Sequence, residues 1–318
     1  MNHKFSVIIP LYNKRAEISE TLNSVFTQSY PAHEIIIIDD GSTDGSSEVV
    51  KQLINNFELQ DNHIPVKFIT QSNAGECASR NRGMKEATGD WFALLDADDQ
   101  WEEGYLETIA YLIDKYPNCG AYCTSFSLLS HRGLTHGNTP QQEGVVEDYF
   151  RIALMKGKLI LTSSTTTISR NVVDMIGSFP EGMKIGGDLY MWFKILTNGW
   201  KVAFSPKRMS RINIVASNRS ASIYETEKTP YSLRDFWKKG DFYRNEYLAK
   251  VELVKAIKIS AKGGDEYAHS AEKFYSYNKC SRLAWYKLWI LNRLPHRWRT
   301  PILRFYDRIT WILVKRGF

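Results

Sequence analysis

The first 115 residues alternate short apolar runs with amphipathic segments, and this alternation limits the possible folds more than any other feature of the sequence. Four runs rich in β-branched and aromatic residues predict buried strands, at 5–11, 33–40, 65–71 and 90–96. The intervening segments carry apolar residues at helical spacing. Parallel strands alternating with helices are joined by right-handed crossovers, so the pattern predicts an α/β fold with a mainly parallel sheet flanked by helices.

Polar side chains stand where three of these predicted strands end. They are Tyr12 and Asn13, Asp39 and Asp40, and the acids Asp96, Asp98 and Asp99 of the stretch LLDADDQW. Open α/β sheets bind ligands beyond the carboxyl ends of their strands, so we expect these clusters to meet at one edge. Neighbouring carboxylates repel unless a cation shares their site, and Mg²⁺ and Mn²⁺ prefer such oxygen ligands. Alternatively, the acids cap a helix or lie in solvent.

Four segments resemble, in the right order, the motifs of the family 2 glycosyltransferases. They are SVIIPLYNK, EIIIIDDGSTDGS, NAGECASRNRGMKEATGDWFALLDADD and GGDLYMW. The resemblance covers roughly residues 5–215 and implies the A-type glycosyltransferase fold, which is Rossmann-like and binds a nucleotide sugar. No Gly-x-Gly-x-x-Gly fingerprint or P-loop follows the first strand, which argues against dinucleotide enzymes and nucleoside triphosphatases.

The resemblance implies contacts to the nucleotide at the first two strand ends. Pro10, Tyr12 and Asn13 match the loop that contacts the base. Asp39 or Asp40 resembles the acid that hydrogen-bonds the uracil ring, and the sequence does not decide between the two. A UDP-sugar is therefore the expected donor.

The resemblance also implies a metal site for Mn²⁺ or Mg²⁺. Asp98 matches the metal ligand of the Asp-x-Asp motif, Asp96 the partner that contacts ribose or metal, and Asp99 supports them. A segment bordering the donor pocket is matched by Asn73, Gly75, Arg80 and Asn81. Arg80 is expected to contact phosphate or an acid, or else to be a surface side chain.

Asp188 matches the acid at the start of an acceptor-side helix. The resemblance implies that it is the general base, which accepts the proton of the acceptor hydroxyl in a single displacement that inverts the anomeric carbon. The usual motif has Glu where this chain has Gly187. Alternatively, Asp188 is an ordinary helix N-cap. Retaining hydrolysis needs a carboxylate pair about 5 Å apart and is the weaker interpretation.

Residues 211–222 match a basic, Ser-rich loop that lies near the donor diphosphate in this family. Its candidate side chains are Arg211, Asn218, Arg219 and Ser220. Two interpretations remain open: closure of the loop over the site, or a solvated loop without a role.

The resemblance ends near residue 225, so we predict a catalytic domain at 1–222 and a helical, basic and aromatic region at 223–318. The last helix is expected to begin near Pro301. Residues 281–318 hold nine Lys or Arg and one acid, Asp307, while the rest of the chain has a net charge of about −2.

No run approaches the ~18–20 apolar residues of a membrane span. Interleaved Trp, Leu and Arg in 281–318 are typical of helices that lie on an anionic membrane surface. A helical bundle with a solvated basic face would have the same composition. Nucleic-acid binding is not expected, because no recognised motif accompanies the basic residues.

The four cysteines are few and irregularly spaced, and the first residues lack the pattern of a signal peptide. We therefore expect a cytoplasmic protein that is peripheral on the inner face of the cell membrane. Cys119 and Cys123 are predicted to be buried thiols rather than half of a zinc site.

These observations predict an inverting, metal-dependent glycosyltransferase. The resemblance to the family implies that its acceptor is a glycan or a lipid-linked saccharide in surface polysaccharide biosynthesis. Two alternatives stay open: a transferase that acts on a protein or a small molecule, and a catalytically idle, membrane-associated module that binds nucleotide sugars.

Overall fold

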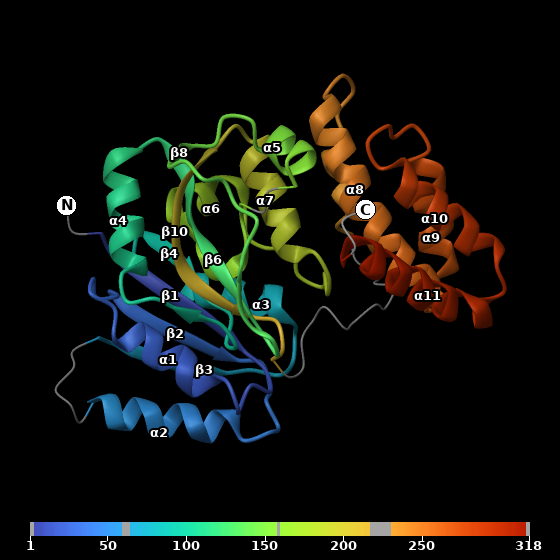
Figure 1. The fold of residues 1–318 in the computed structure, drawn as a ribbon. Helices are drawn as coiled ribbons and strands as arrows, with labels where there is room; N and C mark the ends of the chain where they lie inside the picture. The colour runs from blue at the N-terminus through green and yellow to red at the C-terminus, as the bar shows by residue number, and fades with distance from the viewer. Residues whose placement is uncertain (1–2, 59–63, 158–159, 217–229, 316–318) are drawn as a thin grey trace. The chain divides into compact units, whose positions relative to one another are not determined.

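The computed structural model describes residues 3–58, 64–157, 160–216 and 230–315, with side chains described up to Phe305 (Figure 1). The chain forms two compact units. Among the described residues, the first unit holds 3–216 and 230–232, and the second begins at Leu233. The predicted domain boundary at residue 222 lies outside the described residues.

The first unit is built on one ten-stranded sheet. Its strands are β1 (Phe5–Leu11), β2 (Glu34–Asp39), β3 (Val66–Thr70), β4 (Trp91–Leu94), β5 (Gln100–Trp101), β6 (Cys119–Ser130), β7 (Gly133–His136), β8 (Gly144–Val145), β9 (Thr166–Ser169) and β10 (Lys201–Asn213). The main order is β3-β2-β1-β4-β9-β6-β10-β5, with β7 beside β6 and β8 beside β10. The A-type glycosyltransferase fold predicted from the sequence is confirmed by this α/β architecture together with the structural similarities described below.

The four strands predicted from the sequence form the parallel part of the sheet. β3, β2, β1 and β4 are neighbours, and all three of their pairings are parallel. The second half differs, because β9 runs antiparallel to both β4 and β6, while β6 and β10 pair in parallel. β9 thus joins two parallel groups of strands into one sheet.

Helices cover both faces of the sheet. They are α1 (Ile18–Phe26), α2 (Ser46–Glu58), α3 (Glu76–Glu86), α4 (Tyr105–Lys115), α5 (Tyr149–Met155), α6 (Arg170–Ile176) and α7 (Gly187–Thr197). Alternate residues of a strand face opposite sides. Val7 and Ile9 of β1 join the core cluster with α1 and α4, whereas Ile8 meets α3. A Cβ at Gly83 of α3 would lie 2.5 Å from Cγ2 of Ile8, so glycine permits this close approach.

Two local features of the first unit are its buried cysteines and the start of α2. Cys119 and Cys123 are buried free thiols, as predicted, and burial raises the pKa of Cys119 to about 11. The first N–H group of α2, that of Ser46, is bound by the carboxylate of Asp44 at 3.0 Å.

The second unit is helical, as expected. Its helices are α8 (Phe242–Ala261), α9 (Asp265–Phe274), α10 (Arg282–Arg293) and α11 (His296–Lys315), preceded by a 3₁₀ turn at Leu233–Phe236. The prediction that the last helix begins near Pro301 was wrong, because α11 begins at His296 and contains this proline. Pro301 has no N–H group to donate to the carbonyl of Arg297, and both residues are exposed. Among the described residues no helix combines the length and the apolar character needed to span a bilayer.

The buried carboxylate of Glu34, at the start of β2, binds side chains of β1, of β3 and of the segment before β4. Glu34 is 3% exposed, and its Oε1 accepts hydrogen bonds from Ser6 Oγ at 2.7 Å and Thr88 Oγ1 at 2.8 Å. Lys67 Nζ lies 3.0 Å from Oε2. Burial alone would raise the pKa of Glu34, but the donors of Thr88, Ser6 and Lys67 outweigh it and lower the pKa to about 2.

We predict that Glu34→Gln destabilises the protein by about 1–3 kcal/mol at pH 7. The ordinary pKa of 4.5 lies above the folded-state value, so the carboxylate contributes fully above roughly pH 5, and the contribution disappears as the pH falls toward 2. Urea unfolding of both proteins between pH 7 and pH 3 measures this. A stability difference that stays constant over that range would contradict the prediction.

Candidate functional site

The three polar clusters predicted at the strand ends do lie together. β2, β1 and β4 are adjacent, with Leu11 opposite Asp39 in the register of β1 and β2. Lys14 Nζ bridges from the loop after β1 to Asp98 Oδ2 at 2.7 Å. Asn13 Oδ1 accepts the N–H of Thr43 at 2.8 Å, which ties the loops after β1 and β2 to each other. The carboxyl edge of the parallel strands is therefore one continuous polar surface.

The acids after β4 form a compact cluster. One carboxylate oxygen from each of Asp96, Asp98 and Asp99 lies within 4.8 Å of the other two. Ser164 holds the cluster in place, because its Oγ donates to Asp99 Oδ2 at 2.6 Å and accepts the N–H of Asp96 at 3.1 Å. Oδ1 of Asp99 accepts the N–H of Asn213 at 2.8 Å.

These three acids differ in their exposure to solvent. Asp99 is 4% exposed, and burial together with Asp96 and Asp98 raises its pKa well above the usual range. Burial also raises the pKa of Asp96, although Arg80 opposes this effect. Asp96 and Asp98 are the more accessible pair, so they offer the oxygens that a cation could reach. Asp99 is the buried member of the cluster, and its supporting role stays a prediction.

Arg80 is fully buried, so the interpretation of this residue as a surface side chain was wrong. Its Nη2 donates to Asp96 Oδ1 at 2.7 Å, to Ser163 Oγ at 2.9 Å and to Glu76, while Nη1 donates to Asp188 Oδ1 at 3.1 Å. Arginine offers several donors in one fixed plane, which suits it to hold carboxylates from different elements. Of the two partners expected for Arg80, phosphate or an acid, the structure shows acids.

Asp188 lies in the first turn of α7, and the N-cap of this helix is Gly186 with a φ of 85°. The Asp188 side chain therefore is not the N-cap that the alternative interpretation required. It faces Arg80 and also accepts a hydrogen bond from Ser163 Oγ at 2.9 Å. Asp188 is 41% exposed at its side chain, so it stays accessible to a substrate while two donors fix its orientation.

Asp39 and Asp40 are almost fully buried, with exposures of 2% and 3%. Asp40 accepts the N–H groups of Ala74 and Gly75, each at 2.8 Å, and the amide of Gln71 at 2.8 Å. Asp39 accepts the N–H of Ser42 at 2.9 Å and the hydroxyl of Ser47. Asp40 thus anchors the segment before α3, and Asp39 anchors the turn before α2.

The remaining candidates lie in different environments. Tyr12 is 41% exposed, while Pro10 is half-buried within β1. Asn73 donates to the carbonyl of Asp40 at 3.1 Å. Arg211 belongs to β10 rather than to a loop, and it forms an ion pair with Glu102 at 2.6 Å, so its expected place in a closing loop is wrong. Asn218, Arg219 and Ser220 lie outside the described residues.

Four further side chains contact the acids or Arg80 and were not predicted from the sequence: Lys14, Glu76, Ser163 and Ser164. Burial with Asp188, Asp96 and Asp98 nearby raises the pKa of Glu76 to about 8, although Arg80 opposes the shift. The spacing of Glu76 and Arg80 at i and i+4 in a helical segment was the one available signal. Ser163 and Ser164 sit in a 3₁₀ turn before β9 and carry no recognisable pattern.

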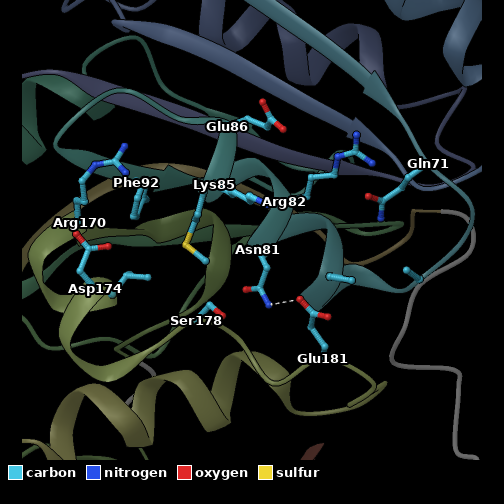
Figure 2. A pocket seen from close by; sticks show the side chains of 14 residues that line it. Gln71, Asn81, Arg82, Lys85, Glu86, Phe92, Arg170, Asp174, Ser178 and Glu181 are labelled. Carbon is cyan, nitrogen blue, oxygen red and sulfur yellow. Dashed lines mark hydrogen bonds between the residues drawn. The ribbon is translucent and has the colours of Figure 1, made fainter.

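A separate pocket of about 740 Å³ opens beside the outer face of α3 (Figure 2). Its lining includes Arg82, Lys85, Arg170, Asp174 and Glu181, which carry charges of both signs. Figure 2 shows Asn81 hydrogen-bonded to Glu181 across this pocket, at 2.8 Å. None of the carboxylates bound by Arg80 lines it. Among the described residues, Asn81 is the only predicted site residue in the lining of this pocket. The acid cluster therefore remains the candidate site.

Comparisons with known proteins identify the family and several relatives of this chain. The model of the family described as glycosyl transferase family 2 matches residues 6–174. The putative teichuronic acid biosynthesis glycosyltransferase TuaG of Bacillus subtilis is 36% identical over 129 residues, or 40% of this chain and 48% of TuaG. The poly(ribitol-phosphate) β-N-acetylglucosaminyltransferase TarS of Staphylococcus aureus is 26% identical over 281 residues, or 87% of this chain and 45% of TarS. The chain thus spans about half the length of these relatives.

Solved structures share the fold at low sequence identity. Residues 1–349 of Staphylococcus aureus TarS, in complex with UDP-GlcNAc, match with a TM-score of 0.59 and 22% identity, covering 86% of this chain and 73% of that one. The mannosyltransferase PcManGT of Pyrobaculum calidifontis, in complex with GDP-Man and Mn²⁺, matches with a TM-score of 0.54 and 17% identity. That match covers 95% of this chain and 84% of PcManGT.

Gly187 and Cys77 form a packing pair beside Asp188. A Cβ at Gly187 would overlap Cys77 Sγ, so the thiol fills the space that a side chain at 187 would need. We predict that Gly187→Ala destabilises the protein by about 1–3 kcal/mol through overpacking. Cys77→Ala in the same chain should recover most of this loss, which urea unfolding of the two single variants and the double variant measures. Additive effects of the two substitutions would show that they do not compete for one space.

Proposed function

This chain belongs to glycosyl transferase family 2, and from that premise we propose that it transfers a sugar from a nucleotide-sugar donor to a hydroxyl group of a saccharide acceptor. The observation that carries the proposal is the shared guanidinium of Arg80. Asp96 of the acid cluster and Asp188 bind the same side chain. A group suited to the donor side and a group suited to the acceptor side therefore lie close together.

The acid cluster fits a divalent cation, Mn²⁺ or Mg²⁺. Three carboxylate oxygens lie within 4.8 Å of one another, and oxygen ligands of this kind are those that both ions prefer. Asp98 and Asp96 would hold the ion, with Asp99 buried behind them. A bound cation would neutralise the negative charge that develops on the diphosphate leaving group.

Asp188 is the proposed general base. Its carboxylate accepts the proton of the acceptor hydroxyl as that oxygen forms a bond to the anomeric carbon and the bond to the diphosphate breaks. This single displacement inverts the anomeric configuration. Ser163 and Arg80 donate to the two oxygens of Asp188, so the base has a fixed orientation.

A UDP-sugar is the proposed donor. Asp39 accepts two hydrogen bonds from the protein, whereas Asp40 accepts three. A carboxylate oxygen has two lone pairs, so Asp39 keeps more capacity to accept a further bond. We therefore assign the contact with uracil to Asp39, with Pro10 and Asn13 shaping the adjacent loop. The exposed ring of Tyr12 supplies a surface for the base.

The proposed acceptor is a glycan or a lipid-linked saccharide in the biosynthesis of a cell-surface polysaccharide. The support comes from two relatives: TuaG, a putative glycosyltransferase of teichuronic acid biosynthesis, and TarS, a poly(ribitol-phosphate) β-N-acetylglucosaminyltransferase. A transferase acting on a protein or small molecule, or a module that binds nucleotide sugars without turnover, would share the same fold. Activity measurements separate these alternatives.

We further propose that the second unit holds the enzyme on an anionic membrane at its cytoplasmic side. Leu283, Tyr286 and Ile290 of α10 lie on one exposed helical face, and Leu283 is 83% exposed. Trp298, Ile302 and Phe305 share an exposed face of α11. No acid occurs between residues 281 and 305, while six Lys or Arg do. Exposed aromatic and aliphatic side chains among cations complement an anionic lipid surface.

Replacing the proposed base and the proposed metal ligand tests the activity. With a panel of UDP-, GDP- and dTDP-sugars and Mn²⁺ or Mg²⁺, the wild type should consume a UDP-sugar. Asp188→Asn should lower turnover at least 100-fold while donor binding persists, because a general base contributes roughly 10²–10⁴-fold. Asp98→Ala should weaken donor binding in the presence of Mn²⁺. Unchanged turnover in both variants would contradict the assignment, and donor binding without turnover in the wild type would favour the idle module.

Flotation with liposomes tests the membrane surface. The full-length protein should bind vesicles that contain phosphatidylglycerol better than vesicles of phosphatidylcholine alone. Leu283→Ser combined with Ile302→Ser should reduce this binding several-fold. Val254→Ser is the control, since Val254 is an exposed aliphatic residue similar in exposure to Ile302, at 46% against 39%, but lies on α8. Equal partitioning of wild type and double variant would overturn the proposed surface.

A further inference from the structure

Lys14 has no role in the function proposed so far, yet it contacts the acid cluster directly. Its Nζ lies 2.7 Å from Oδ2 of Asp98, the proposed metal ligand. The two side chains are only 10% and 14% exposed, so water screens this ion pair weakly. An ammonium group and a divalent cation repel each other, so close binding of one at Asp98 disfavours close binding of the other.

The backbone of Lys14 is held firmly at the carboxyl end of β1. Its N–H donates to Ser46 Oγ at 2.9 Å, and its carbonyl accepts the N–H of Ile18 at 2.9 Å. The preceding residue, Asn13, has a φ of 51°, which sets a tight turn after the strand. The ammonium group, in contrast, is joined to this backbone by four methylene groups. It can therefore change partners while the loop stays in place.

Arg80, the second cation that contacts the acid cluster, is less able to change partners. Arg80 is fully buried and binds Asp96, Asp188, Glu76 and Ser163 at the same time. Withdrawing its guanidinium would break several charged hydrogen bonds together and would leave the buried hydroxyl of Ser163 without this donor, which is costly. Of the two cations that the described residues place on the acids, Lys14 is thus the one that can leave.

We propose that Lys14 and a divalent cation are alternative partners of Asp98. Without metal, the ammonium group of Lys14 neutralises Asp98 and keeps the acid cluster together. With metal, the ammonium group leaves Asp98 and binds the diphosphate of the donor, for which a compact positive charge is well suited. The inference rests on the metal site of the proposed function. It makes Lys14 a competitor of the metal in the free protein and a partner of the nucleotide in the complex.

Calorimetric titration with Mn²⁺ alone, in the absence of any nucleotide, tests the competition. Lys14→Met removes the charge but keeps a chain of similar length, and it should bind Mn²⁺ at least about fivefold more tightly than the wild type. Lys14→Gln should shift the affinity in the same direction, which guards against a defect peculiar to one variant. Lys4→Met is the matched control, because Lys4 is exposed and precedes the opposite end of β1. It should bind Mn²⁺ like the wild type.

A second titration, with UDP in the presence of saturating Mn²⁺, tests the second partner. Here Lys14→Met should bind UDP at least about fivefold more weakly than the wild type. Unchanged or weaker Mn²⁺ binding by both Lys14 variants would overturn the proposal, as would Mn²⁺ binding that survives Asp98→Asn. Undiminished UDP affinity would reject the contact with the diphosphate. Sugar transfer by the wild type is measured separately. If the wild type transfers sugar but the Lys14 variants bind Mn²⁺ like the wild type, the role of Lys14 is rejected and the proposed function stands.

Discussion

The site depends on one buried guanidinium. Arg80 is fully inaccessible to solvent and binds acids from its own helix, from the loop after β4 and from α7. A buried guanidinium is tolerated only when partners compensate its charge, and Glu76, Asp96 and Asp188 do so although their side chains are 38%, 33% and 41% exposed. The ion pairs of Arg80 with Asp96 and Asp188 therefore fix the position of the proposed base relative to the acid cluster. Loss of either partner would destabilise the protein.

The cluster still contains more acids than cations. Glu76, Asp96, Asp98, Asp99 and Asp188 stand against Arg80 and Lys14. Burial and mutual repulsion raise the pKa of Glu76 to about 8 and also raise the pKa of Asp96 and Asp99. Raised pKa values mean that the folded protein holds negative charge in an unfavourable setting. A divalent cation would relieve this repulsion, which links the electrostatics of the acid cluster to the proposed metal-assisted transfer.

Much of this arrangement could be predicted from the sequence. The apolar runs gave β1 to β4 to within two residues, because buried parallel strands need continuous apolar side chains. The meeting of the clusters after β1, β2 and β4 followed from the geometry of parallel strands. The antiparallel β9 did not follow, since TTIS is too short and too polar to be distinguished from a loop. Ser163, Ser164 and Lys14 were missed because their roles arise from contacts across long stretches of chain.

The central claim is that Asp188 serves as base in an inverting displacement. It can be tested without knowing the acceptor, by letting water accept the sugar of an α-linked UDP-sugar and recording proton NMR spectra before the free sugar equilibrates. The account predicts that the β-anomer appears first, and that Asp188→Asn suppresses its formation. Initial release of the α-anomer by the wild type would contradict it.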